Sequence, residues 1–327
     1  MKNKKAFEFT FGWLFAMLVG AVILFLAIYA TINLVETFRF RHETETAKQI
    51  GTLLYPVETN LESAKSAKIL VPTETRLQNT CESVGDFGNQ EISILESSGI
   101  GGKWRSPDSA QVASTFQNKY LFSSEDSDAK KEFYILSKPI NFPFKITDIQ
   151  ILWADTEFYC FANAPQEIKK EFTELKLKNV YFNSSKANCP TDSTIVCFTE
   201  SNCGINVDIS RKLVTKNSQQ LYFDFSFASD RNSLLYAAIF SPPEIYNCQI
   251  QRLMQRAAHL ADIYIQKSEF YKTRGCGSEI LPGILKDYKN TAIKEIAEET
   301  PDIRKLRSVS EDLEDKNEFL SQKCTLF

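Results

Sequence analysis

Eight cysteines are the residues whose type and number most clearly indicate chemistry in this chain of 327 residues. They are Cys81, Cys160, Cys189, Cys197, Cys203, Cys248, Cys276 and Cys324. An even number of cysteines in an exported domain favours disulfide bonds, which persist only in an oxidising compartment. The spacing leaves about a hundred pairings open, so the sequence predicts disulfides without assigning partners. Buried free thiols are the alternative.

Three of these cysteines, Cys189, Cys197 and Cys203, lie close enough in sequence to suggest a zinc site. The segment lacks the C-x-x-C spacing of structural zinc sites, and no histidine lies nearby. Local disulfides are therefore the better interpretation, and the sequence predicts no metal site and no cofactor.

The remaining candidates for catalysis are sparse. Only two histidines occur, His42 and His259, and no G-x-S-x-G turn accompanies them. The segment 98–103 contains three glycines and a lysine, but it lacks the G-K-[ST] order of a phosphate-binding loop. Asp126 and Asp128 do not continue into the register of a calcium-binding EF-hand. We assign no catalytic residue, and an exported enzyme that uses carboxylates such as those at 155 and 157 is kept as an alternative.

Two further features concern the surface of the protein. Asn183 begins an Asn-Ser-Ser tripeptide, which is the acceptor pattern for N-glycosylation and follows a predicted strand. The net charge is −3, and the basic residues are scattered along the chain. Nucleic-acid binding requires a concentrated basic face, so the sequence predicts no nucleic-acid partner.

The amino-terminal segment is the element that determines where this chemistry takes place. Residues 9–35 contain no charged residue and are long enough to cross the hydrocarbon layer of a bilayer as a helix. Lys2, Lys4 and Lys5 precede this segment, which favours an amino terminus inside and a carboxyl-terminal domain outside the cytoplasm. A buried core helix and a cleaved signal peptide are the alternatives; the segment is longer than a typical signal-peptide core.

The opening residues also resemble a known family. Lys4 and Lys5, followed by Ala6 and a long apolar run that contains Glu8 near its start, resemble the precursors of type IV pilins and archaeal pilin-like proteins. In that family a basic leader is removed just before the helix, and the resemblance implies a filament subunit. Here Ala6 replaces the usual glycine, and Glu8 is second rather than fifth after the expected cleavage point. The general layout resembles N-terminally anchored archaeal surface proteins, which implies no activity.

The rest of the chain changes its pattern twice. Apolar spacing predicts helices over 33–55 and 57–69, and period-two runs then predict strands from residue 74 to about residue 240. The predicted strands include 119–122, 132–137, 220–227 and 234–240, with a hairpin turn at 123–128 between the first two. Pro165 predicts the start of an inserted helix. Apolar stripes after Pro243 predict helices to the end, which pack in the core or associate with a second copy.

These observations define an α+β protein with five parts. We expect a cytoplasmic tail (1–8), a transmembrane anchor in the lipid bilayer (9–35), a helical stalk (36–72), a mostly antiparallel β domain with an inserted helix (73–241) and a C-terminal helical bundle (242–327). The expected function is a structural or binding role at the cell envelope, with self-association or an envelope protein as partner. A pilin-like filament subunit and an exported enzyme are the alternatives.

Overall fold

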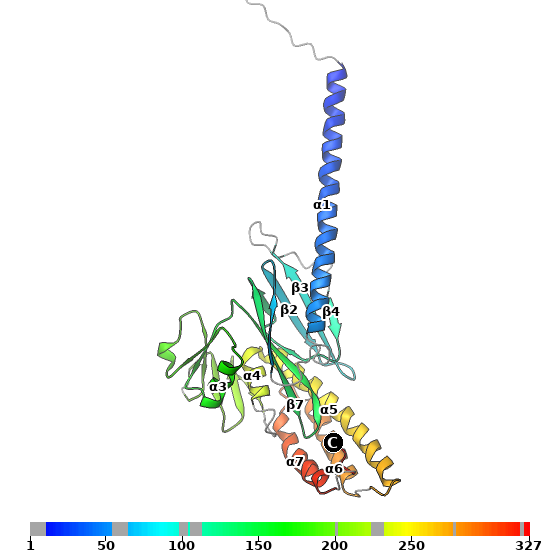
Figure 1. Ribbon diagram of the computed structural model, residues 1–327, viewed down its shortest axis with the longest axis vertical. Helices are drawn as coiled ribbons and strands as arrows, with labels where there is room; N and C mark the ends of the chain where they lie inside the picture. Colours follow the sequence, from blue (N-terminus) through cyan, green and yellow to red (C-terminus); the bar gives the residue numbers. More distant parts are fainter. Residues whose placement is uncertain are drawn as a thin grey trace, which may run out of the picture.

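Figure 1 shows a long helix that projects from a folded body made of β-sheets and carboxyl-terminal helices. This computed structural model describes residues 11–53, 65–97, 104, 113–199, 202–223, 232–276, 279–320 and 324–327. Side chains are described for these residues except 35–53, 65, 96, 113 and 114. The mixed α+β class predicted from the sequence is confirmed.

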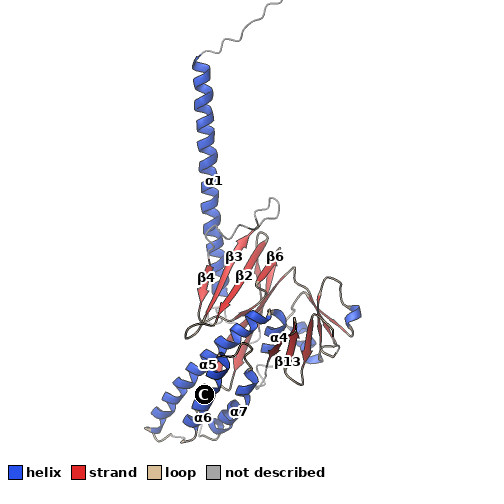
Figure 2. Ribbon diagram, turned by 180° about the vertical axis from the view of Figure 1, so that it is seen from behind, coloured by secondary structure: helices blue, strands red, loops and turns tan. Residues whose placement is uncertain are grey.

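The projecting helix α1 covers Phe11–Leu53. Its first part, Phe11–Leu34, has a mean hydropathy of 2.6, and none of it is buried within the protein. Phe25, for example, is 68% exposed. The carboxyl end of α1 lies beside strands β3 and β4, as Figures 1 and 2 both show. The folded body thus holds one end of α1 and leaves the apolar end exposed.

Two four-stranded sheets form the part of the body nearest to α1. The first sheet has the order β1-β7-β8-β5 and the second the order β4-β3-β2-β6. Their strands are β1 (Lys65–Leu70), β2 (Thr75–Glu82), β3 (Asn89–Glu96), β4 (Ala113–Phe116), β5 (Leu121–Phe122), β6 (Asp126–Ala129), β7 (Glu132–Asn141) and β8 (Lys145–Ala154). Leu77 and Ile92 of the second sheet pack against Phe133 and Leu152 of the first in a small apolar core.

The third sheet has six strands in the order β10-β9-β11-β12-β13-β14. They are β9 (Tyr159–Ala162), β10 (Val180–Asn183), β11 (Thr194–Cys197), β12 (Ile205–Asp208), β13 (Leu213–Lys216) and β14 (Gln219–Tyr222). Strands β10, β9, β11 and β12 are parallel, whereas β12, β13 and β14 are antiparallel. The predicted helix after Pro165 is confirmed as α3 (Gln166–Glu174), which buries Ile168 and Phe172, and a short 3-10 helix η1 (Lys186–Asn188) follows β10.

Helices form the end of the body that lies away from the apolar part of α1 (Figure 1). They are α5 (Pro243–Lys272), α6 (Leu281–Ile296), the 3-10 helix η2 (Ile303–Leu306) and α7 (Arg307–Glu318). The short helix α4 (Ser233–Phe240) lies inside the body, against strands β5, β7, β8 and β13. The predicted apolar stripes are buried; Leu253, Leu285 and Leu313, one from each long stripe, lie in the largest apolar core of the protein. The stripes therefore pack the core of a single chain.

One predicted strand is wrong. Residues 234–240 form most of helix α4 instead of a strand, and every residue from Ser233 to Phe240 is buried. A short run that is apolar on all sides contains neither a two-residue nor a 3.6-residue period, so its pattern does not separate a buried strand from a buried helix.

Two local predictions near the first two sheets are also wrong. Residues 65–69, expected at the end of a helix, form strand β1, which pairs with β7; residues 54–64 lie outside the described part. The expected hairpin turn at 123–128 contains strand β6, which pairs with β2, while β5 pairs with β8. The chain crosses from one sheet to another at this point. Local turn residues do not report which strand a segment will pair with, because that choice depends on distant partners.

Candidate functional site

A cleft of about 700 Å³ lies where the third sheet meets the start of α5. Its walls come from the segment before β6, from strands β9, β11, β12 and β13 and from the junction between α4 and α5. The lining residues are Ser124, Glu125, Asp126, Tyr159, Thr194, Gly204, Ile205, Lys216, Asn217, Phe240, Ser241, Pro242 and Glu244. Tyr159, Ile205 and Phe240 are almost fully buried, so the accessible groups of the cleft are mainly polar and charged.

Lys216 is the cation of this cleft. It is the last residue of β13, and its Nζ donates hydrogen bonds to the carbonyl oxygens of Ile239 at 2.7 Å and Ser241 at 2.9 Å. These carbonyls lie at the carboxyl end of α4, where a positive charge is favourable. Burial lowers the pKa of Lys216 to about 8, and the negative charges of nearby glutamates oppose that change. The side chain thus joins two elements and still faces the cleft.

Glu157 lies behind Ser124, at the edge of the cleft. Its carboxylate accepts hydrogen bonds from the Ser124 hydroxyl at 2.6 Å and from the Ala154 N–H at 2.7 Å. Burial raises the pKa of Glu157, although these hydrogen bonds favour the charged form.

The raised pKa of Glu157 is expected to make the free energy of unfolding depend on pH. A carboxyl group whose pKa is higher in the folded than in the unfolded protein favours folding at low pH, and this contribution is lost as the pH rises from the unfolded pKa through the folded one. We therefore expect the free energy of unfolding of wild type, relative to that of Glu157→Gln, to fall as the pH rises above about 4.5. Urea unfolding of both proteins at a series of pH values measures this free energy. Glu174→Gln, which changes an exposed carboxyl group at the end of α3, is the control, and equal pH profiles for wild type and Glu157→Gln would contradict the prediction.

Three carboxylates line the mouth of the cleft. Asp126 is partly neutralised, because Arg76 lies 3.5 Å from it and Gln78 donates a hydrogen bond to it at 3.0 Å. Glu125 and Glu244 are exposed, and no ion pair involves either of them within the described part of the chain. Glu244 lies in the first turn of α5, which favours an acidic residue. The mouth of the cleft is therefore acidic, and its floor carries a lysine.

Among the residues that the structure describes, those that the sequence offered for enzyme chemistry are not brought together. Asp155 accepts hydrogen bonds from the N–H groups of Lys130 and Lys131, so its carboxylate stabilises a turn while that of Glu157 lies beside the cleft. His259 is exposed on α5, with Nε2 3.2 Å from the carbonyl oxygen of Asp86. His42 lies in α1, and its side chain, like the segment 98–103, is outside the described part of the structure. Asp126 and Asp128 both pair with Arg76.

The eight cysteines form four disulfides. They join Cys81 to Cys248, Cys160 to Cys189, Cys197 to Cys203, and Cys276 to Cys324. The cysteines at 189, 197 and 203 are thus bonded, and none of them offers a free thiolate to zinc. The Cys197–Cys203 bond is local, as the spacing suggested, whereas the Cys81–Cys248 bond spans much of the chain.

Asn183 lies at the end of β10 and is half-buried. Its side-chain nitrogen donates to Sγ of Cys160 and to the carbonyl oxygen of Asn188, both at 3.2 Å. These two contacts use both hydrogens of the amide. A glycan on this nitrogen would replace one of them, so glycosylation requires a local change at this position.

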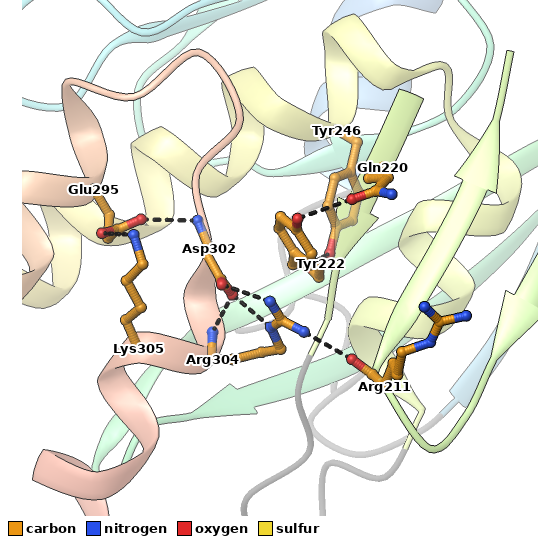
Figure 3. A network of polar contacts seen from close by, with 8 residues as sticks. All are labelled: Arg211, Gln220, Tyr222, Tyr246, Glu295, Asp302, Arg304 and Lys305. Atoms are coloured by element: carbon orange, nitrogen blue, oxygen red, sulfur yellow. Dashed lines mark hydrogen bonds and ion pairs between the residues drawn. The ribbon is translucent and has the colours of Figure 1, made fainter. Parts of the chain in front are cut away.

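A second polar network fastens the C-terminal helices to the third sheet, and Figure 3 shows its side chains. Arg304 forms an ion pair with Asp302, donates to the carbonyl oxygen of Arg211 at 2.8 Å and lies 4.0 Å from the ring centre of Tyr222. Glu295, from α6, accepts from Lys305 and from the backbone N–H of Asp302. All these groups are used within the network, so its role is to hold two parts of the protein together.

Lys216 and Glu244, like Glu125, are charged cleft residues that the sequence analysis did not single out. Neither belongs to a motif, and they are 28 positions apart (216 to 244). Strand β13, which ends at Lys216, was not predicted from the sequence, so the only local signal was an isolated charged residue. Comparison of the chain with protein-family models, with curated proteins and with solved structures finds no match.

Proposed function

We propose that this chain is a single-pass membrane protein with an extracytoplasmic binding domain. Residues 9–35 are the anchor in the lipid bilayer, the amino terminus is cytoplasmic, and the folded body has a binding or structural role at the cell envelope. The cleft around Lys216 is the candidate ligand site, and an envelope protein or a second copy is the candidate macromolecular partner.

One observation supports the proposal most strongly: an apolar helix without internal packing and a body with four disulfides occur in the same chain. Phe11–Leu34 has 24 residues and is 0% buried, and a helix of that length measures about 36 Å, which exceeds the bilayer's hydrocarbon thickness of about 30 Å. So much exposed apolar surface is unfavourable in water. The four disulfides fit an oxidising compartment outside the cytoplasm.

Topology is tested by fusing reporters to the carboxyl terminus. We expect a phosphatase that is active only outside the cytoplasm to be active after residue 327, and a fluorescent protein that matures only in the cytoplasm to stay dark. Replacing Lys2, Lys4 and Lys5 together by Glu removes the positive flank and is expected to lower the exported fraction. The matched control replaces Lys169, Lys170 and Lys176, which lie in and after α3. A fluorescent, cytoplasmic carboxyl terminus would overturn the orientation.

Mass spectrometry of the intact protein separates the anchor from a pilin-like subunit. An uncleaved anchor retains every residue after the initiating Met. A processed pilin-like precursor would lack the residues up to Ala6. A measured mass without these residues would favour a filament subunit over an anchored binding protein.

A further inference from the structure

We propose that the cleft binds a small amino carboxylate, with the ligand's carboxylate on Lys216 and its ammonium group at Glu125 and Glu244. This inference names the ligand of the binding role proposed above and rests on the cleft being the ligand site. It does not depend on the membrane topology, because binding is measured on the purified protein.

The positive charge at the floor of the cleft is the ammonium group of Lys216, and two hydrogen bonds fix its orientation. The Lys216 ammonium group has three hydrogens, and the carbonyl oxygens of Ile239 and Ser241 accept two of them. The two hydrogen bonds hold the side chain in place. No third acceptor for Lys216 occurs among the residues that the structure describes, so its third hydrogen can serve an acceptor in the cleft that Lys216 lines. The amino end of α5 lies at the same cleft, because Ser241, Pro242 and Glu244 line the cleft. The helix dipole adds a partial positive charge at this end of α5.

The mouth of the cleft has the opposite sign. Glu125 and Glu244 line the cleft, and both are exposed and outside any ion pair among the described residues. An anion without a positive group would lie near two exposed carboxylates, one of which, Glu244, already interacts electrostatically with Lys216, and both would reduce the attraction of the anion to the lysine. A cation alone would pair with exposed glutamates in water, where such pairs contribute little. A ligand with both charges can pair its anionic group with Lys216 at the floor and its cationic group with the glutamates at the mouth.

The size of the cleft limits the ligand to a small molecule. A volume of about 700 Å³ is within the usual range for small-molecule sites. An amino acid or a short peptide with a free carboxylate and an amine meets the charge requirement and fits this volume. The accessible wall groups are hydroxyl, amide and carboxylate groups, as on Ser124, Thr194 and Asn217, which suits a polar ligand.

Isothermal titration calorimetry of the purified full-length protein in detergent tests whether the ligand must carry both charges. Three probes of equal chain length are compared: 6-aminohexanoate, hexanoate and hexylamine. We expect saturable binding of 6-aminohexanoate only. Lys216→Met should weaken this binding at least about tenfold, whereas Glu244→Gln should weaken it less and reduce the preference over hexanoate. The control variants Lys170→Met and Glu174→Gln change exposed residues of α3 and should leave binding unchanged.

A second measurement does not depend on the folding of a variant. Reductive methylation of wild type with formaldehyde and cyanoborohydride, followed by peptide mass spectrometry, reports the access of each lysine. We expect 6-(dimethylamino)hexanoate, a tertiary-amine form of the probe that formaldehyde does not methylate, to slow methylation of Lys216 and not of Lys170. Equal affinity for hexanoate and 6-aminohexanoate would reject the amino carboxylate while keeping the cleft as a ligand site. Absence of saturable binding, or saturable binding that Lys216→Met does not weaken and that does not protect Lys216 from methylation, would reject the site. Neither result bears on the membrane anchor.

Discussion

Replacement of Arg252 by Met is expected to lower the free energy of unfolding by about 4 kcal/mol, because several buried or partly buried acceptors would lose their donor together. Arg252 is 0% exposed. Its guanidinium donates to the backbone carbonyl oxygens of residues 87, 116, 117 and 119 and to the side-chain oxygen of Gln249, at 2.8 to 3.3 Å. Burial lowers the pKa of Arg252 to about 10, so it stays charged at neutral pH. Urea unfolding with the disulfides intact measures the loss.

The matched variants separate charge from hydrogen bonding. Arg252→Lys keeps the charge but has fewer donors and no planar fork, so we expect a loss close to that of the Met variant. Arg274→Met changes an exposed arginine beyond the end of α5 and should change the free energy of unfolding by less than about 0.5 kcal/mol. If Arg252→Met were as stable as Arg274→Met, the buried hydrogen bonds would have no net stabilising effect.

The position of Arg252 also explains a glycine in the loop between β2 and β3. Gly88 has a φ of +57°, and a Cβ there would lie 2.9 Å from Cγ of Arg252 and 2.3 Å from the carbonyl oxygen of Glu82. A residue without a side chain lets the arginine pass close to this backbone. Gln255, one turn further along α5, donates to the carbonyl oxygens of Ser83 and Gly85 in the same loop.

The sequence predicted the apolar face of α5 but could not predict this arginine. Ile250, Leu253 and Ala257 follow helical spacing, which reports the face that enters a core. Arg252 lies between them in sequence, and its partners are mostly backbone carbonyls more than a hundred residues away. A backbone carbonyl carries no sequence signature, so the contact becomes evident only when the fold is known.

The same reason limits what could be predicted about the cleft. Its charged groups come from the ends of different elements, Glu125 from the segment before β6, Lys216 from β13 and Glu244 from α5. Spacing along one element can be read from a sequence, and it predicted the helix after Pro165 and most of the strands. These three residues come together only because the chain crosses between sheets in a particular way. The sequence predicted two segments of this course wrongly: 123–128 as a hairpin turn and 234–240 as a strand.

Removal of the Cys81–Cys248 disulfide is expected to lower the free energy of unfolding by about 5 kcal/mol, and removal of Cys197–Cys203 by only about 2 kcal/mol. The two cysteines of the first bond are 167 positions apart, and those of the second are 6 apart. A crosslink that closes a longer loop removes more conformational freedom from the unfolded chain. Paired Cys→Ala variants of each bond, compared by urea unfolding, measure the difference.

The long-range bond also joins two parts with different roles. Cys81 lies in β2 of the sheet that holds α1, and Cys248 lies in α5, which carries the C-terminal core. Arg252 and Gln255 bind the adjoining loop, so this bond and the Arg252 hydrogen bonds stabilise one junction. Neighbouring groups are not independent, and we expect the combined variant to lose less than the sum of its separate losses. Strict additivity would show that the disulfide and the Arg252 hydrogen bonds act independently. A larger loss for Cys197–Cys203 would contradict the order expected from loop length.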